Sequence, residues 1–249
     1  MTAVRTAAPL LRMSGIGMRF ADGTSALDSV DISVSAGQFV AVVGPSGCGK
    51  STLLRLAAGL IQPTSGTVAR QTDELTYVFQ DPALLPWRTV LANVELAAEL
   101  RRMPKAQRRR RAEEALELVG LTEFARHRPH TLSGGMRMRV SLARSLTLRP
   151  ELFLFDEPFG ALDEMTRERL GGEVTRLFAT REFGAVFVTH SVTEAVFLST
   201  KVIVLSGRHR VLGEFDVPFD YPRPPQLRFE ERFARLAGSV SACLREEAG

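Results

Sequence analysis

The sequence predicts an α/β fold in which a mostly parallel sheet carries an inserted helical subdomain. Two observations predict it. Apolar runs of strand length, such as 39–43 and 152–155, alternate with segments of helical periodicity, and strands that alternate with helices form parallel sheets covered on both faces. From about residue 89 to 150 the pattern is entirely helical, which indicates a subdomain beside the sheet.

The elements follow in order along one predicted domain, 1–249. Residues 11–43 are expected to form strands, antiparallel at the N-terminal side, and a helix is expected from about Lys50 to Leu60, because Gly59 ends the pattern. Further strands are predicted at 76–79, 152–155, 185–188 and 202–205, with a helix over about 166–179.

The tail, residues 208–249, is broken by prolines before a last predicted helix. Its apolar residues recur on one helical face: Phe229, Phe233, Leu236 and Val240. We expect this helix to dock on the core of its own chain, and a partner-binding helix is the alternative.

Composition excludes several classes of protein. Hydrophobic residues make up 45% and charged residues 24%, which is a globular and not a disordered balance. Cys48 and Cys243 are too few for a disulfide framework or a zinc site. No apolar run is long enough for a membrane-spanning helix, and residues 1–11 contain no apolar stretch of signal-peptide length. We therefore expect a cytosolic protein.

The formal net charge is +4, and its densest cluster consists of the arginines at 101–102 and 108–111. Such a cluster could contact nucleic acid or anionic lipid. Three glutamates within 113–117 follow at helical spacing, however, so we favour a solvent-exposed helix face held by ion pairs.

A glycine-rich segment fits the phosphate-binding pattern G-x-x-x-x-G-K-[ST], with a predicted strand before it and a helix after it. Its glycines allow backbone N–H groups to turn toward phosphate, and the helix N-terminus adds a partial positive charge. Lys50 is expected to contact the β- and γ-phosphates, and the Ser51 hydroxyl to ligate Mg²⁺. The predicted nucleotide-binding residues here are Gly44, Pro45, Ser46, Gly47, Cys48, Gly49, Lys50, Ser51 and Thr52. A P-loop NTPase core is therefore predicted.

Two more segments can contact phosphate or metal. The strand 152–155 ends in Asp156, which is placed to bind Mg²⁺, and in Glu157, which could polarise an attacking water. Ser133, Gly134 and Gly135 begin a predicted helix and could form a second anion site. A capped helix with a flexible start is the alternative for these three residues.

The order of these motifs, followed by Ala161-Leu162-Asp163 and His190, resembles the nucleotide-binding subunit of ATP-binding cassette (ABC) transporters over roughly residues 10–215. The resemblance implies two subunits that clamp two ATP molecules head to tail. The phosphate loop of each subunit then faces Ser133, Gly134 and Gly135 of the other.

The resemblance also assigns single residues. Phe20 would stack on adenine, although a core phenylalanine at a strand end is a fair alternative. Gln80 would sense Mg²⁺ and the attacking water, and Glu157 would be the general base. His190 would hold the γ-phosphate, its alternative being a capping or core histidine, and Asp163 would link the two sites across the dimer.

The sequence departs from the family pattern at two positions. Met136 replaces the glutamine that usually follows the signature glycines, and Thr131 stands where glutamine is frequent. Because a thioether is a poor hydrogen-bond partner, the polar contact usual at position 136 is not expected here.

The resemblance further implies partners. A chain without its own membrane span requires a separate integral membrane permease, and we expect Leu85 and Trp87 in the segment 80–87 to line a groove for a permease helix. Packing between sheet and helical subdomain is the alternative. The sequences of the segments 84–90, 132–139 and 158–163 are similar to those of the nitrate/sulfonate/taurine importer branch.

The expected protein is thus a homodimeric ATPase at the cytoplasmic face of a bacterial inner membrane, linked indirectly to a periplasmic substrate-binding protein. Two rival functions are a cassette ATPase acting on nucleic acid, which would use the arginine cluster, and a P-loop kinase or GTPase. A kinase would not need the Ser-Gly-Gly signature, and no Asn-Lys-x-Asp motif is present.

Overall fold

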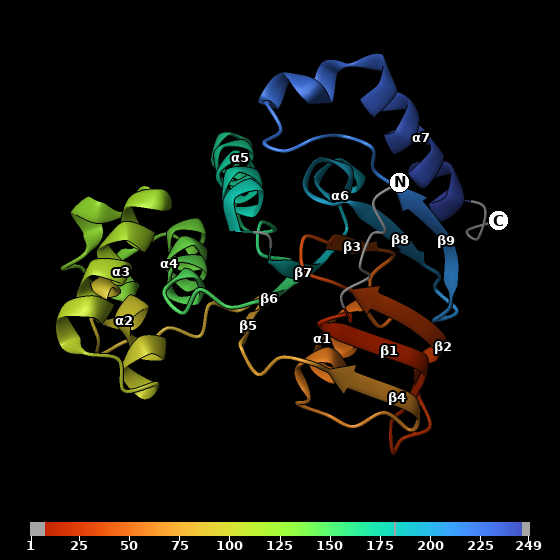
Figure 1. The fold of residues 1–249 in the computed structure, drawn as a ribbon, viewed down its shortest axis with the longest axis horizontal. Helices are drawn as coiled ribbons and strands as arrows, with labels where there is room; N and C mark the ends of the chain where they lie inside the picture. Colours follow the sequence, from red (N-terminus) through yellow and green to blue (C-terminus); the bar gives the residue numbers. More distant parts are fainter. Residues whose placement is uncertain (1–7, 182, 246–249) are drawn as a thin grey trace.

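The computed structural model describes residues 8–181 and 183–245 (Figure 1). Residues 1–7, which belong to the segment expected to contain no signal peptide, and residues 246–249 of the predicted tail lie outside the described residues.

A six-stranded sheet forms the centre of the fold, in the order β5-β6-β7-β3-β8-β9. The strands are β5 (Leu75–Val78), β6 (Leu152–Asp156), β7 (Gly184–Thr189), β3 (Phe39–Val43), β8 (Lys201–Leu205) and β9 (Val211–Asp216). The first five are parallel, and β9 pairs antiparallel with β8. This confirms the mostly parallel sheet, to which β9 adds a strand that was not predicted.

A second, antiparallel sheet precedes the core, in the order β2-β1-β4. Its strands are β1 (Leu11–Arg19), β2 (Ser25–Val34) and β4 (Ser65–Arg70). The expectation of N-terminal antiparallel strands is confirmed.

The central strands are buried on both faces, because alternate side chains enter two separate cores. Val40 and Val42 pack with helix α1 (Lys50–Ala58) and the three-stranded sheet. Phe39, Ala41 and Val43 face the opposite side, which is covered by the helices α5 (Glu164–Arg181), α6 (Val192–Leu198) and α7 (Glu231–Arg245). In Figure 1 these helices lie on one side of the sheet and α1 on the other.

The predicted helical subdomain extends beyond the β5 edge of the sheet (Figure 1). It consists of α2 (Val90–Leu100), α3 (Lys105–Leu118), the 3₁₀ helices η1 (Thr122–Phe124) and η2 (Pro129–Thr131), and α4 (Gly134–Leu146). On α3, Arg109 lies 3.0 Å from Glu113 and Arg110 lies 3.5 Å from Glu114. Two arginines of the cluster therefore form the predicted ion pairs along this helix face, and Arg101, at the end of α2, pairs with Glu74 at 3.3 Å instead.

The C-terminal tail returns to the core through β9, η3 (Pro225–Phe229) and α7. Phe233 and Val240 are buried as predicted, but Phe229 is 85% exposed. That part of the prediction is wrong, because the helix begins at Glu231 and leaves Phe229 in η3 with a different side-chain direction. None of the helices in the described residues is long and apolar enough to cross a membrane.

Candidate nucleotide site

The parallel register brings the predicted site residues to one edge of the sheet. Val43 at the end of β3 pairs with Thr189 of β7, and Asp156 of β6 pairs with Val188. Val78 of β5 pairs with Phe155. The segments that follow these strands, which carry the phosphate loop, Glu157, His190 and Gln80, therefore leave the same carboxyl edge, where α/β proteins bind ligands.

The phosphate loop owes its shape to glycine at two positions. Gly49 has a φ of 100°, and a Cβ there would clash with the backbone oxygen of Ala26 on β2. A Cβ on Gly44 would lie 2.6 Å from the Leu205 oxygen and 2.7 Å from the Cys48 sulfur. Larger residues would thus displace the loop from both sheets.

Lys50 is folded back into this loop. Its Nζ donates to the backbone oxygens of Gly44 and Pro45, each at 2.8 Å, and lies 3.9 Å from the Cys48 sulfur. Burial raises the pKa of the Cys48 thiol despite the nearby Lys50 charge. Cys48 is thus a neutral, buried side chain that supports the loop, and Lys50 can exchange its carbonyl partners for phosphate oxygens.

The buried Asp156 carboxylate is held from both sides. Ser51 Oγ donates to its Oδ1 at 2.8 Å, and the Tyr77 hydroxyl donates to its Oδ2 at 2.9 Å. Burial is the main cause that raises the pKa of Tyr77, and the Asp156 charge adds to it. The structure therefore brings two of the three predicted metal ligands, Ser51 and Asp156, into contact, while Gln80 forms no hydrogen bond with either of them among the described residues.

Glu157 and His190 form a second pair beside Asp156. His190 Nδ1 lies 3.1 Å from Glu157 Oε2. Glu157 has a φ of 46°, a conformation that is unfavourable for a residue with a side chain, and its N–H donates to the Val188 oxygen at 3.0 Å. Strained backbone of this kind clusters at functional sites.

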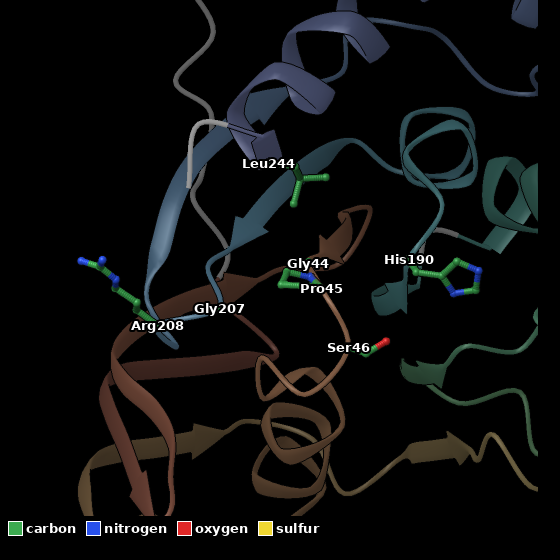
Figure 2. A pocket seen from close by; sticks show the side chains of 7 residues that line it. All are labelled: Gly44, Pro45, Ser46, His190, Gly207, Arg208 and Leu244. Atoms are coloured by element: carbon green, nitrogen blue, oxygen red, sulfur yellow. The ribbon is translucent and has the colours of Figure 1, made fainter. Parts of the chain in front are cut away.

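A cavity of about 620 Å³ opens at the phosphate loop (Figure 2). It is lined by Gly44, Pro45, Ser46, His190, Gly207, Arg208 and Leu244. Leu244 reaches it from the end of α7, and the Arg208 side chain is directed away from the loop in this view. The last three residues were not predicted to belong to the site, since neither the loop after β8 nor the tail that supplies them shows a motif.

The signature residues stand apart from this cavity. Ser133 is the N-cap of α4 and its Oγ accepts from the Met136 N–H at 3.2 Å, with Gly134 and Gly135 opening the helix. Ser133 and Gly134 are exposed. Figure 1 shows α4 in the helical subdomain and α1, which follows the phosphate loop, under the core sheet. The capping geometry predicted as the alternative is therefore present, and it leaves the signature free to face another molecule.

Of the predicted residues, only Gly44, Pro45, Ser46 and His190 line the cavity, and Phe20, Gln80 and Asp163 lie on other segments. Phe20 follows β1 in a tight turn and is 39% exposed, and Gln80 is exposed after β5. Asp163 caps α5, because its Oδ1 accepts from the Thr166 N–H at 2.9 Å. This hydrogen bond lowers the pKa of Asp163.

The segment after Gln80 is tied to the helical subdomain. Arg144 of α4 donates to the oxygens of Pro82 and Ala83 at 2.8 and 3.0 Å. Buried Asn93 of α2 accepts from the Leu85 N–H at 2.7 Å. Trp87 is nevertheless 69% exposed, so its ring does not serve as packing between the sheet and the subdomain.

Two polar residues were missed: Tyr77, which contacts Asp156, and Glu194, which contacts Thr189 next to His190. Tyr77 carries no motif, because nothing in a strand sequence shows which hydroxyl meets a carboxylate. Glu194 was detectable, since Ser191-x-x-Glu194 ahead of an apolar run is a capping signature. In the structure Ser191 Oγ accepts from the Glu194 N–H at 3.3 Å and begins α6, a helix that was not predicted.

Comparison with known proteins agrees with this geometry. Residues 27–160 match the ABC transporter family. The aliphatic sulfonates import ATP-binding protein SsuB 1 of Mesorhizobium japonicum is 44% identical, over 91% of this chain and 85% of its own length. The nitrate import ATP-binding protein NrtD of Synechococcus elongatus is 41% identical, over 85% of this chain and 81% of its own. Both relatives confirm the predicted similarity to the nitrate/sulfonate branch.

Solved structures give the same result. The dimeric bacterial ABC transporter cassette MJ0796 superposes with a TM-score of 0.79 at 32% identity, covering 84% of this chain and 100% of that chain. A post-hydrolysis state of the same cassette, bound to ADP and Pi, superposes with a TM-score of 0.77. This chain belongs to the ABC transporter family, as an ATP-binding protein that hydrolyses ATP.

Proposed function

We propose that this chain is the ATP-hydrolysing subunit of an importer. It works as a homodimer around two ATP molecules and drives a separate integral membrane permease. One observation carries the proposal: the Ser51–Asp156 contact and the Glu157–His190 pair lie at one sheet edge beside the phosphate loop. The residues proposed as metal ligands, base and phosphate contact are thereby adjacent, as hydrolysis of a phosphoanhydride requires.

The donor atoms fit a magnesium nucleotide. Ser51, Asp156 and Gln80 offer oxygen atoms, which Mg²⁺ prefers, and the ion supplies charge that offsets the β- and γ-phosphates. The backbone N–H groups of residues 46–52 surround the phosphates, and Lys50 moves from the oxygens of Gly44 and Pro45 to the phosphate oxygens. Phe20 stacks on the adenine from the first sheet.

Hydrolysis then depends on residues of two subunits. Glu157 accepts a proton from the attacking water, and His190, fixed by Glu157, donates to the γ-phosphate. The exposed N-terminus of α4 completes the phosphate contacts when the second subunit arrives, through Ser133, Gly134 and Gly135 of the partner subunit. Asp163 lies at the dimer contact. ATP binding therefore closes the dimer and hydrolysis reopens it.

The role of Glu157 is tested by Glu157→Gln. The amide still occupies the site but cannot accept a proton, so we expect nucleotide binding to persist while turnover falls at least about 100-fold, the usual scale for a general base. Light scattering should then detect an ATP-dependent dimer. Glu214→Gln, on an exposed strand, is the matched control and should hydrolyse ATP normally. Normal turnover by Glu157→Gln would remove Glu157 from this role.

The permease contact is assigned to Leu85 and Trp87. Their segment is fixed by Asn93 and Arg144 but leaves Trp87 exposed, which suits an aromatic anchor for a short partner helix. Leu85→Asp or Trp87→Asp should abolish co-purification with the permease and leave the isolated ATPase active. Leu100→Asp, an exposed position on the same subdomain, is the control. Equal permease recovery in all variants would refute the assignment.

For the solute we propose a small anion or organic acid of the nitrate or aliphatic sulfonate class, because relatives with those names cover most of this chain. A periplasmic binding protein would deliver it, and this subunit would lie at the cytoplasmic face of the inner membrane. Deletion of the gene should abolish growth on either nitrate as nitrogen source or an alkanesulfonate as sulfur source. Normal growth on both would exclude this class.

A further inference from the structure

Arg167 and Glu194 connect the two loops that carry Asp163 and His190. Arg167 Nε lies 3.2 Å from Glu194 Oε1, an ion pair between α5 and α6. The Nε–H is not aligned for a hydrogen bond, so the contact is electrostatic. The Glu194 side chain is only 11% exposed, which reduces the screening of this pair by water.

On one side, Glu194 fixes the residues that flank His190. Thr189 Oγ1 donates to Glu194 Oε2 at 2.6 Å and accepts from the Ser191 N–H at 3.0 Å. Ser191 Oγ in turn accepts from the Glu194 N–H. The His190 side chain is 64% exposed and cannot be held by packing, so its position depends on this loop and on Glu157.

On the other side, Arg167 fixes the loop before α5. Its Nη2 donates to the Leu162 oxygen at 3.1 Å, and its backbone N–H donates to the Asp163 oxygen at 2.9 Å. That loop packs against the signature: a Cβ on Gly135 would lie 3.2 Å from Leu162 Cδ2 and 3.3 Å from the Ala161 oxygen. A shift of the signature therefore reaches Arg167 through Leu162.

A continuous path thus runs from Gly135 through Leu162, Arg167 and Glu194 to the His190 loop. In the head-to-tail dimer of the proposed function, on which this inference rests, the signature and His190 of one chain serve different ATP molecules. We propose that the Arg167–Glu194 pair is the link, within each chain, that makes the two ATP sites cooperative. Both are positioning residues, since they act through the loops that carry Leu162 and His190 and neither lines the cavity at the phosphate loop.

The buried position of the Glu194 carboxylate also indicates a functional role for this residue. Burial raises the pKa of this carboxyl, and Thr189, Arg167 and His190 oppose the shift. The groups that face it also include Glu157, which adds to the increase, and Arg228 of η3 lies close enough to feel its charge. Burial of the charged carboxylate costs folding free energy, so stability alone does not explain why a glutamate occupies this position.

The experiment compares the full-length chain with Arg167→Met, Glu194→Gln and the double variant. ATP hydrolysis is measured against ATP concentration, and a fluorescent nucleotide reports binding to the monomer. Arg176→Met is the matched control, because Arg176 lies on α5, is exposed and pairs only with its helical neighbour Glu173 among the contacts described for it.

We expect the Hill coefficient to fall from about 2 toward about 1, with kcat reduced about tenfold and nucleotide affinity of the monomer unchanged. The double variant should be no worse than the worse single variant, because both residues act in one path. A purely structural pair would instead lower the unfolding midpoint and leave the Hill coefficient intact, which would overturn the proposal. Equal loss in Arg176→Met would overturn it as well.

A different result is expected if the proposed dimer with two ATP sites is wrong. A wild-type Hill coefficient of about 1 would refute the two-site clamp of the proposed function, and with it this inference. A cooperative wild type with equally cooperative variants would refute only the Arg167–Glu194 link.

Discussion

The hydrogen bond from Tyr77 to Asp156 should tune the metal site. Tyr77→Phe removes a half-buried hydroxyl that holds one oxygen of a buried carboxylate, while Ser51 retains the other. Hydrogen bonds to charged groups contribute about 1.5–3 kcal/mol, and partial exposure places this one at the lower end. For 249 residues a loss of about 1.5 kcal/mol lowers the melting temperature by about 3 °C.

The decisive readout is metal dependence. Loss of a partner behind a metal ligand typically weakens metal binding 10- to 100-fold, so we expect about tenfold more Mg²⁺ to be needed to saturate ADP binding. Tyr221→Phe is the matched control, because Tyr221 donates to the neutral Leu198 oxygen, away from the phosphate loop. It should also lose stability, by about 1 kcal/mol, yet keep its Mg²⁺ requirement. An unchanged Mg²⁺ requirement in Tyr77→Phe would refute the reasoning.

Three further outcomes are expected. Gly49→Ala should lose nucleotide binding, measured by fluorescence titration, and about 1–3 kcal/mol of stability, whereas Gly172→Ala, in an open helical position, should gain up to about 1 kcal/mol. Phe39→Ala, in a fully buried aromatic cluster, should cost about 3–5 kcal/mol in urea unfolding. Glu194 has a pKa raised above 4.5 by burial, so its folded state favours the proton. Stability from this group is therefore present at low pH and lost as pH rises, and Glu194→Gln should gain unfolding free energy over wild type between pH 4 and 7. An equal difference at both pH values would contradict that sign.

The core could be predicted from the sequence because its signals are local. The apolar run 39–43 is short and ends at a glycine, which is typical of a buried strand, and the phosphate-loop pattern fixes the turn and the helix that come after β3. Asp156 and Glu157 could be placed for the same reason, since they stand at the end of a strand.

The features that the sequence did not reveal depend on contacts between distant segments. Tyr77 meets Asp156 only because β5 and β6 are neighbours in register. The exposure of Phe229 depends on where α7 begins, and a periodic pattern does not locate a helix start to within two residues. The Arg167–Glu194 pair requires α5 and α6 to pack side by side.

Because the side chains of the central strands alternate between two cores, the number of residues in each strand is fixed. Each residue of β3, β6 or β7 advances the chain by about 3.3 Å and reverses the side-chain direction. Deleting one residue from β6 would exchange its contributions to the two cores and draw Asp156 back from Ser51 at the same time. These strands can therefore change in composition but not in length, and insertions or deletions among homologues should be confined to the loops at the opposite edge of the sheet and to the helical subdomain.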